Sequence, residues 1–408
     1  MDILPILSTL KRHKTAAGLI ILQIALTCAI VCNALFLISE RIATINAPSY
    51  MADDELIVLG ISGMRRDENG DAQTRADLAA LRQVPGVKSV FVTNQMPFGE
   101  NSNNSGVKLE PGETVRNVLV ASQYTVSEDW LPTLGLRLAE GRDFTPEEYV
   151  DAKVTDQEDP KIPAIIINKI MADRLFPGES ALGKSLYVFG KDPQRVVGVL
   201  AELIPPYPKA NAASQDRYGM VLPIRPTYRG GYFMVRTDPA QRDAVMKASI
   251  AALNKSSLGI KRVVRYQKLF ADMRSEYYQQ DRSMVWLLCG VCVGLLIVTA
   301  FGIVGLASFW VQQRTRMIGT RRALGATRGQ ILRYFQTENF MLSTVGIVLG
   351  MVAAYGISLA LMRSYELPRL PLYYLPVGAV ILWLLGQIAV WAPARRAALL
   401  PPVAALRS

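Results

Sequence analysis

The residues that most resemble a chemical motif lie near the middle of the chain. Residues 178–185 read G-E-S-A-L-G-K-S, which matches the pattern of a phosphate-binding loop. Such a loop needs a strand before it and a helix after it, so that helix N–H groups point at the phosphates. Here the expected order is reversed, because a helix is predicted over 168–176 and a strand over 186–189. The pattern therefore indicates a glycine-rich turn with a solvated Lys184.

Cysteine and histidine offer little further chemistry. The four cysteines, Cys28, Cys32, Cys289 and Cys292, all lie in long apolar runs, so the CxxC spacing of the last two indicates small apolar packing residues. The single histidine is His13, so the rest of the chain has none for a metal site or a Ser-His-Asp triad. We therefore predict no catalytic residues, no metal site and no cofactor bound by this chain.

Four apolar runs decide how the chain is organised. They cover residues 17–38, 284–310, 340–362 and 373–392, and none contains Asp, Glu, Lys or Arg. Roughly 20 apolar residues suffice to cross a bilayer as a helix. The first run is longer than the apolar stretch of a signal peptide, roughly 7–15 residues, and we expect it to be a retained anchor. The sequence thus predicts four transmembrane α-helices.

Charge predicts the orientation of these helices. Residues 41–283 carry a net charge of +1, and the remaining +10 of the formal +11 lies mostly beside the apolar runs. These flanking residues are Lys11, Arg12 and Lys14 before the first run, Arg314, Arg316, Arg321, Arg322, Arg328 and Arg333 between the second and third, and Arg395, Arg396 and Arg407 after the fourth. Basic flanking segments stay in the cytoplasm.

The charge pattern therefore assigns a side to each segment. The interfacial segment 1–16, the loop 311–339 and the tail 393–408 are predicted to be cytoplasmic. The domain 39–283 and the loop 363–372 are predicted to lie outside. The basic excess is accounted for by topology and by attraction to anionic lipid, so nucleic acid is not an expected partner.

The large domain reads as mixed α/β. Strands are predicted over 55–60, 87–93, 164–168, 186–189 and 195–200, and helices over 74–83, 169–176 and 239–254; the polar stretches 99–106 and 150–161 are expected to be exposed loops. Leu269, Met273 and Tyr277 follow helical spacing, which predicts a stalk helix over 267–283 that continues into the second apolar run. Helix and run together would form a rod of roughly 60 Å.

Small residues predict where the spanning helices meet. Gly290 and Gly294 form one GxxxG pair, and Gly346 and Gly350 form another. Such pairs permit close approach of two helix backbones in a membrane.

The chain resembles ABC transporter permeases of the MacB/FtsX type, the mechanotransmission class. The segments 85–90 (P-G-V-K-S-V), 127–144 and 164–199 resemble the MacB-type periplasmic core domain, including the false phosphate loop. Residues 312–338 (Q-Q-R-T-R-M-I-G-T-R-R-A-L-G-A-T-R-G-Q-I-L-R-Y-F-Q-T-E) resemble the cytoplasmic segment of the permease domain, and residues 391–407 resemble its usual end.

The chain departs from the family pattern at a few positions. Met317, Pro401 and Ala404 stand where the family usually has acidic residues. MacB carries an ATPase domain before its first span, whereas only 16 residues precede the first run here. We therefore expect the ATPase to be a separate polypeptide and this chain not to be an enzyme.

The resemblance implies a function and a set of partners. It implies a multi-pass permease of the bacterial inner membrane that couples ATP hydrolysis by an ABC ATPase dimer to a change in its periplasmic domain, for export. The alternatives are a lipoprotein-extracting permease and a regulator of a cell-wall hydrolase. The expected partners are that ATPase, which binds the ATP, a second copy or a paralogous permease, membrane lipid, and a periplasmic adaptor with an outer-membrane channel.

The ATPase contact is expected in the loop between the second and third runs. A short amphipathic helix is predicted there, followed by a helix that enters the third run. The expected contact residues are Arg316, Met317, Ile318, Gly319, Arg321, Arg322, Leu324, Gly325 and Ala326, with Ile318 and Leu324 as apolar anchors. A basic helix lying on anionic lipid is the alternative. The few apolar residues and the small ones between them favour a protein partner.

Overall fold

The computed structural model divides the chain into two compact units. It describes residues 14–63, 70–99, 101–112, 115–156, 160–208, 217–229, 231–256, 262–365 and 369–399. One unit, the α/β unit, is Asn46–Gln279, and the other, the helical unit, is formed by the sequence on either side. Parts of the expected terminal segments, including His13 and Pro401, and residues 366–368 of the expected loop 363–372 lie outside the described residues.

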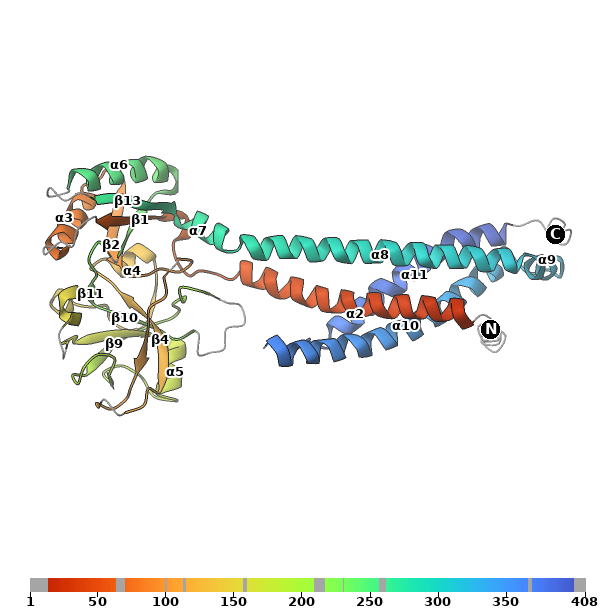
Figure 1. The fold of residues 1–408 in the computed structure, drawn as a ribbon, viewed down its shortest axis with the longest axis horizontal. Helices are drawn as coiled ribbons and strands as arrows, with labels where there is room; N and C mark the ends of the chain where they lie inside the picture. The colour runs from red at the N-terminus through yellow and green to blue at the C-terminus, as the bar shows by residue number, and fades with distance from the viewer. Residues whose placement is uncertain are drawn as a thin grey trace. The chain divides into compact units, whose positions relative to one another are not determined.

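Four long helices make up most of the helical unit (Figure 1). They are α2 (Lys14–Ile45), α8 (Gln279–Gln313), α10 (Arg328–Tyr365) and α11 (Tyr374–Ala398), and each is long and apolar enough to cross a membrane. A short helix, α9 (Thr315–Ala323), lies between α8 and α10 in the chain. The prediction of four spanning helices, with a large α/β domain between the first and second, is confirmed in these terms.

Polar side chains link the long helices to one another. Thr27 and Thr299 share a buried hydrogen bond of 2.8 Å between α2 and α8. The Asn33 amide donates to the Ala354 carbonyl of α10 at 3.1 Å. The Trp383 indole of α11 donates to Thr344 of α10 at 3.1 Å. In a hydrocarbon layer such bonds join helices that hydrophobic burial alone would not hold together.

The four-stranded sheet of the α/β unit has the strand order β13-β1-β12-β2. Its strands are β1 (Leu56–Gly63), β2 (Val87–Thr93), β12 (Tyr232–Thr237) and β13 (Arg262–Leu269), and β1 runs antiparallel to both of its neighbours. The helices α3 (Gly70–Arg82) and α6 (Arg242–Lys255) bury apolar residues against it, among them Leu78, Leu81 and Val245.

The larger sheet of the α/β unit runs β3-β4-β10-β7-β9-β5, with β8 paired to β9. Its strands are β3 (Asn104–Val107), β4 (Leu119–Thr125), β5 (Leu138–Gly141), β7 (Ala164–Asn168), β8 (Ser185–Leu186), β9 (Gln194–Leu200) and β10 (Gly219–Leu222). The helix α5 (Lys169–Leu175) follows β7 and packs against the buried isoleucines of that strand. A short pair, β6 (Val150–Asp151) with β11 (Ile224–Arg225), and the helix α4 (Trp130–Leu134) complete the unit.

Several expectations from the sequence differ from this fold. Residues 99–106 do not form a loop throughout, because β3 begins at Asn104 and pairs with β4. The predicted stalk helix over 267–283 is wrong in two respects: its first residues belong to a strand, and it does not continue unbroken into α8. Residues up to Leu269 belong to β13, where Leu269 pairs with Ile57, so the apparent helical spacing starts inside a strand. The helix α7 then spans Phe270–Tyr277. Tyr278, with a φ of −89° and a ψ of 9°, follows it and separates α7 from α8.

A buried ion pair fixes the helices of the smaller sheet. Asp77 of α3 is 0% exposed and receives both terminal nitrogens of Arg262 in β13, whose side chain is 3% exposed. The Ser256 hydroxyl, next to α6, also donates to Asp77 at 2.7 Å, and the Gln73 amide donates at 2.9 Å. Each charge therefore has several partners to replace the water it loses.

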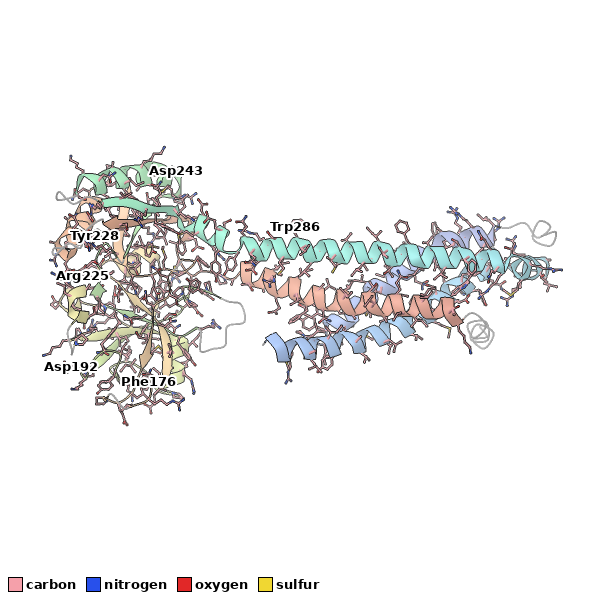
Figure 2. All side chains as sticks on the ribbon, in the orientation of Figure 1. Phe176, Asp192, Arg225, Tyr228, Asp243 and Trp286 are labelled. Carbon is pink, nitrogen blue, oxygen red and sulfur yellow. The ribbon has the colours of Figure 1, made fainter. Side chains whose placement is uncertain are left out.

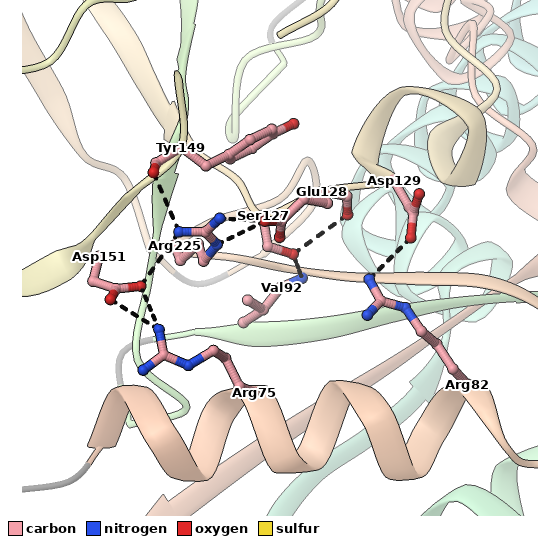
Figure 3. A network of polar contacts seen from close by, with 9 residues as sticks. All are labelled: Arg75, Arg82, Val92, Ser127, Glu128, Asp129, Tyr149, Asp151 and Arg225. Carbon is pink, nitrogen blue, oxygen red and sulfur yellow. Dashed lines mark hydrogen bonds and ion pairs between the residues drawn. The ribbon is translucent and has the colours of Figure 1, made fainter. Parts of the chain in front are cut away.

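A second, more exposed network joins α3 to the short strand pair (Figure 3). Arg75 donates to both carboxylate oxygens of Asp151, and Arg225 of β11 donates to Glu128, to Asp151 and to the Tyr149 carbonyl. Burial raises the pKa of Glu128, but the hydrogen bonds and charge of Arg225 outweigh burial and hold that pKa below its usual value. The network therefore favours the ionised carboxylate at neutral pH.

The two networks predict different costs when a carboxylate is removed. Asp77→Ala leaves Arg262 buried without its counter-ion and should lower the free energy of unfolding of the full chain by about 3–5 kcal/mol. Asp151→Ala opens only a partly exposed pair with Arg75 and should cost ~1 kcal/mol or less. Thermal unfolding of the detergent-solubilised protein measures both, and equal losses in stability would contradict the assignment.

Candidate functional site

Three local features shape the segment between α8 and α10: the break after α8, a turn at Gly325 and a cap at Thr327. α8 ends at Gln313 and α9 begins at Thr315. After α9, Gly325 adopts a φ of +97°, which side chains rarely allow and which turns the chain. Thr327 then caps α10, because its hydroxyl accepts from the Gln330 N–H at 3.3 Å while the Gln330 side chain accepts from the Thr327 N–H at 2.9 Å. We call residues 315–327 the coupling segment.

A buried ion pair anchors the start of this segment. Nη1 of Arg314 donates to both oxygens of Glu338 in α10, at 3.0 and 2.8 Å, and the two side chains are 8% and 2% exposed. The guanidinium also lies 5.6 Å from the ring centre of Trp310 in α8. The pair therefore fixes the end of α8 to the first third of α10.

Two further contacts fix α9 itself. Arg322 donates to the carbonyl of Ala398, at the end of α11, where cationic groups interact favourably with a helix terminus. The Arg321 guanidinium lies 5.0 Å from the ring centre of Tyr334 in α10. These contacts link α9 to both α10 and α11.

The expected contact residues divide into exposed and buried groups. Arg316, Met317, Arg321, Leu324 and Gly325 are exposed, Arg322 and Ala326 are partly buried, and Ile318 and Gly319 are buried. Leu324, in the short turn between α9 and α10, is 84% exposed. Ile318 is 2% exposed and belongs to the core cluster that holds Trp310, Ile331 and Phe335.

The burial of Ile318 corrects one expectation from the sequence. The sequence offered Ile318 and Leu324 as equivalent anchors for a partner, but Ile318 anchors α9 to its own helical unit. The side chain of Ile318 points inward from α9, because α9 lies on the ends of α10 and α11. Leu324 alone of these two presents an apolar side chain outward.

A hollow of about 220 Å³ lies beside the exposed residues. It is lined by Met317, Ile318, Arg321, Ala326, Gln330, Ile331, Tyr334 and Phe335. Met317 and Arg321 are exposed at its rim, which is therefore both apolar and cationic. The geometry suits a docking surface that combines one apolar anchor with surrounding positive charge.

The glycine pairs lie in different environments. A side chain at Gly346 or Gly350 of α10 would collide with α2, since a Cβ there would lie 2.9 Å from Cβ of Ile24 and 2.5 Å from Cβ of Cys28 respectively. A Cβ at Gly290 or Gly294 of α8 would have nothing within 4 Å in the described part of the chain. The first pair lies at an interface within this chain, and the second faces outward.

The false phosphate loop has the order predicted from the sequence. α5 precedes it, β8 follows it, and Gly178 and Gly183 have φ values of 77° and 78°. Lys184 is exposed and pairs with Glu179 at 2.8 Å. In the described residues 178–208 no helix begins after the loop, so the feature that binds phosphates in such motifs is not formed here.

Sequence reasoning missed the buried partner of Arg314. Glu338 lies two residues before the third apolar run, where it looked like part of a polar loop. An acidic residue so close to a span, in a segment of otherwise basic residues, was the available signal. Asn339, the last residue of the predicted loop, was missed for the same reason, and Ser343 was missed inside the third apolar run; both are buried in α10 and lie near Gly386 of α11.

Comparison with known proteins agrees with this architecture. A family model described as the MacB-like periplasmic core domain matches residues 20–253, and one described as the FtsX-like permease C-terminal matches residues 290–402. A membrane protein with four spanning helices, an α/β domain after the first and a helical coupling segment before the third is of the ABC transporter permease class. The chain belongs to the MacB/FtsX-type family of these permeases.

Individual relatives agree over most of the chain. The uncharacterized ABC transporter permease YvrN of Bacillus subtilis is 29% identical over 303 residues, 71% of either chain. YknZ, another uncharacterized ABC transporter permease of that organism, is 25% identical over 82% of this chain and 79% of its own length. The crystallised extracellular domain of YknZ covers 51% of this chain with 22% identity and a TM-score of 0.32.

Some relatives are considerably longer. The macrolide export ATP-binding/permease protein MacB of Chromobacterium violaceum is 28% identical over 307 residues, which is 71% of this chain but 44% of that protein. This chain therefore spans less than half the length of that relative.

The pair of Arg314 and Glu338 yields a test by double-mutant cycle. Glu338→Ala should lower the stability of the solubilised protein by about 3–5 kcal/mol, because it leaves Arg314 buried and uncompensated. The double replacement, Arg314→Met with Glu338→Leu, should cost less than the sum of the costs of Arg314→Met and Glu338→Leu made singly. Melting temperatures in detergent measure the cycle, with the exposed Glu276→Ala as control. Additive losses would show that the two side chains are not coupled.

Proposed function

We propose that this chain is the membrane subunit of an ABC exporter whose ATP is bound and hydrolysed by a separate ATPase dimer. The observation that carries the proposal is the exposed Leu324 at the turn of a coupling segment that is otherwise fixed to the helical unit. A docking element must present side chains to its partner and pass on the partner's motion. Leu324 and the adjacent hollow supply the first property, and the bonds of Arg314, Arg321 and Arg322 supply the second.

In this mechanism the spanning helices carry motion and not the cargo. Closure of the ATPase pair moves α9, and the bonds of α9 move the ends of α8, α10 and α11. α8 carries that displacement along its 35 residues, a length of roughly 50 Å, to the start of the α/β unit. The work is then done by the α/β unit on cargo outside the cytoplasm.

The names of the relatives support export as the activity. The longer relatives are described as macrolide export and pyoverdine export proteins, in which ATP-binding and permease parts share one name. We propose that the same division of labour holds here between two polypeptides, in the bacterial inner membrane, with a periplasmic adaptor and an outer-membrane channel. Recovery of a lipoprotein chaperone in place of an adaptor would favour lipoprotein extraction.

A second permease completes the proposed assembly. α8 presents a row of large apolar side chains outward, including Trp286 at 79% and Phe301 at 72% exposed (Figure 2 labels Trp286). Gly290 and Gly294 lie on the same helix with open space around them. Lipid or another permease, identical or paralogous, would cover this surface.

The orientation can be tested by labelling. In a protein without the four native cysteines, Ser102→Cys should react with a membrane-impermeant maleimide added to intact spheroplasts, because β3 and its approach lie in the external domain. Thr327→Cys should react only after lysis, because the basic flanking residues keep the coupling segment in the cytoplasm. The opposite pattern would reverse the orientation.

The docking site can be tested by co-purification. Leu324→Asp should lower the affinity of the permease for the ATPase about thirtyfold, since a truncated or charged anchor typically costs ~2 kcal/mol or more. Less ATPase should then be recovered with tagged permease. Leu399→Asp, an exposed leucine at the end of α11, should retain the ATPase. Ile318→Asp should instead lower the amount of folded permease, because that side chain is buried. Wild-type recovery with Leu324→Asp would place the contact elsewhere.

A further inference from the structure

A cavity of about 580 Å³ opens in the α/β unit along β4, far in sequence from the coupling segment. Its volume falls within the roughly 300–1,000 Å³ typical of small-molecule sites. It is lined by Ser102, Asn104, Asn117, Val118, Leu119, Val120, Ala121, Ser122, Arg174, Pro205, Pro206, Tyr207 and Tyr218. Nothing in the proposed coupling mechanism uses this cavity.

The charge in the described lining of the cavity is positive. Among its described residues Arg174 is the charged one, and it makes no ion pair or side-chain hydrogen bond with any other described residue. Charged neighbours on the same stretch are paired, as Lys169 is with Asp173 at 3.5 Å and Lys184 with Glu179 at 2.8 Å. The described lining contains no carboxylate. A guanidinium with unused donors in such a lining favours an anionic group, which it can bind through two parallel hydrogen bonds.

The rest of the lining offers apolar and amide surface. Val118 and Val120 of the β4 region are 47% and 54% exposed, and Tyr207 is 41% exposed. Asn104 and Asn117 supply side-chain amides that can donate or accept. A ligand that covers the valines and the tyrosine must itself carry an apolar part.

We propose that this cavity binds a small amphiphilic molecule with one negative group, with Arg174 holding that group and Val118, Val120 and Tyr207 covering its apolar part. This site lies apart from the coupling segment. It therefore goes beyond the docking function proposed above.

One wall of the cavity is connected by a hydrogen bond to the end of α7, the last helix of the α/β unit. Pro205, Pro206 and Tyr207 lie in a short segment whose carbonyls are held by specific donors. The Pro206 carbonyl accepts from the Phe98 N–H at 3.0 Å, and the Pro208 carbonyl accepts from the Tyr277 hydroxyl at 3.3 Å. Tyr277 is the last residue of α7.

An aromatic cluster continues this connection. The ring centre of Phe98 lies 5.6 Å from that of Phe270, 5.4 Å from that of Tyr277 and 5.7 Å from that of Tyr278. Tyr278 is the residue at which the helix is interrupted before α8 begins. A ligand that shifts the segment 205–208 therefore alters the contacts of the residues that end α7.

The first experiment measures binding to the full chain in phosphatidylcholine nanodiscs, without an ATPase. The probes are 4-(trifluoromethyl)benzoate and its neutral analogue 4-(trifluoromethyl)benzamide, followed by ¹⁹F NMR line broadening. The benzoate should bind more tightly than the amide. Arg174→Ala should weaken benzoate binding by about fivefold or more and remove its advantage over the amide. Arg195→Ala, an exposed arginine on β9 outside the cavity, should change neither.

Three results would overturn the site. Two concern the wild-type protein: equal binding of the acid and the amide, and no binding of the acid. The third is benzoate affinity unchanged in Arg174→Ala or in Val120→Trp, the second of which fills the cavity from an exposed position. Because no ATPase is present, none of these results bears on the docking of Leu324, and loss of docking would leave this site untouched.

The second experiment tests the connection to α7. Asp272→Cys, exposed on α7, is labelled with a trifluoromethyl reagent in a background without the native cysteines. Unfluorinated benzoate should shift the ¹⁹F resonance. Tyr277→Phe, which removes the bond to Pro208, should abolish that shift while benzoate affinity stays within about twofold. A shift that survives in Tyr277→Phe, or one that is missing in the parent protein, would overturn the connection.

Discussion

The ion pair between Arg314 and Glu338 is the constraint on which the coupling segment depends. Removing two charges from water costs several kcal/mol per ion, and their attraction returns this only if the geometry is good. Here both oxygens of Glu338 accept from one nitrogen of Arg314, and the guanidinium also lies over Trp310. The pair therefore matters more for the alignment of α8 with α10 than for stability. It defines which turn of α10 lies beside the end of α8. With that register set, Ile318 enters the core and Leu324 is left outside.

The sequence predicted the elements whose signals are local and strong. β2 and β7 have the predicted bounds, since each is a short β-branched run followed by a turn or a capping Asn168. The four spanning helices follow from apolar length alone. The helix–turn–helix of the coupling segment was also predicted, because Gly325 needs a left-handed φ that few residues tolerate.

The sequence could not supply what depends on distant pairing. β13 was not predicted as a strand, and its last three residues, 267–269, were included in the predicted stalk helix; its pairing with β1 fixes it as a strand. Tyr278, where the helix is interrupted, packs against the Phe98 ring, 180 residues earlier in the chain. Ile318 and Leu324 look alike in sequence, and their opposite exposures follow from how α9 lies on α10 and α11. The cavity beside β4 likewise gathers residues from five separate segments.

The interruption at Tyr278 also makes the protein modular. In an unbroken helix, each inserted or deleted residue rotates everything beyond it by about 100°. A rigid continuous stalk would thus tie the angular phase of the α/β unit to every length change in α8. The φ and ψ at Tyr278 end α7 before α8 begins, so this residue belongs to neither helix. An exchange of the α/β unit between related permeases that is made at this residue would therefore cut through neither α7 nor α8.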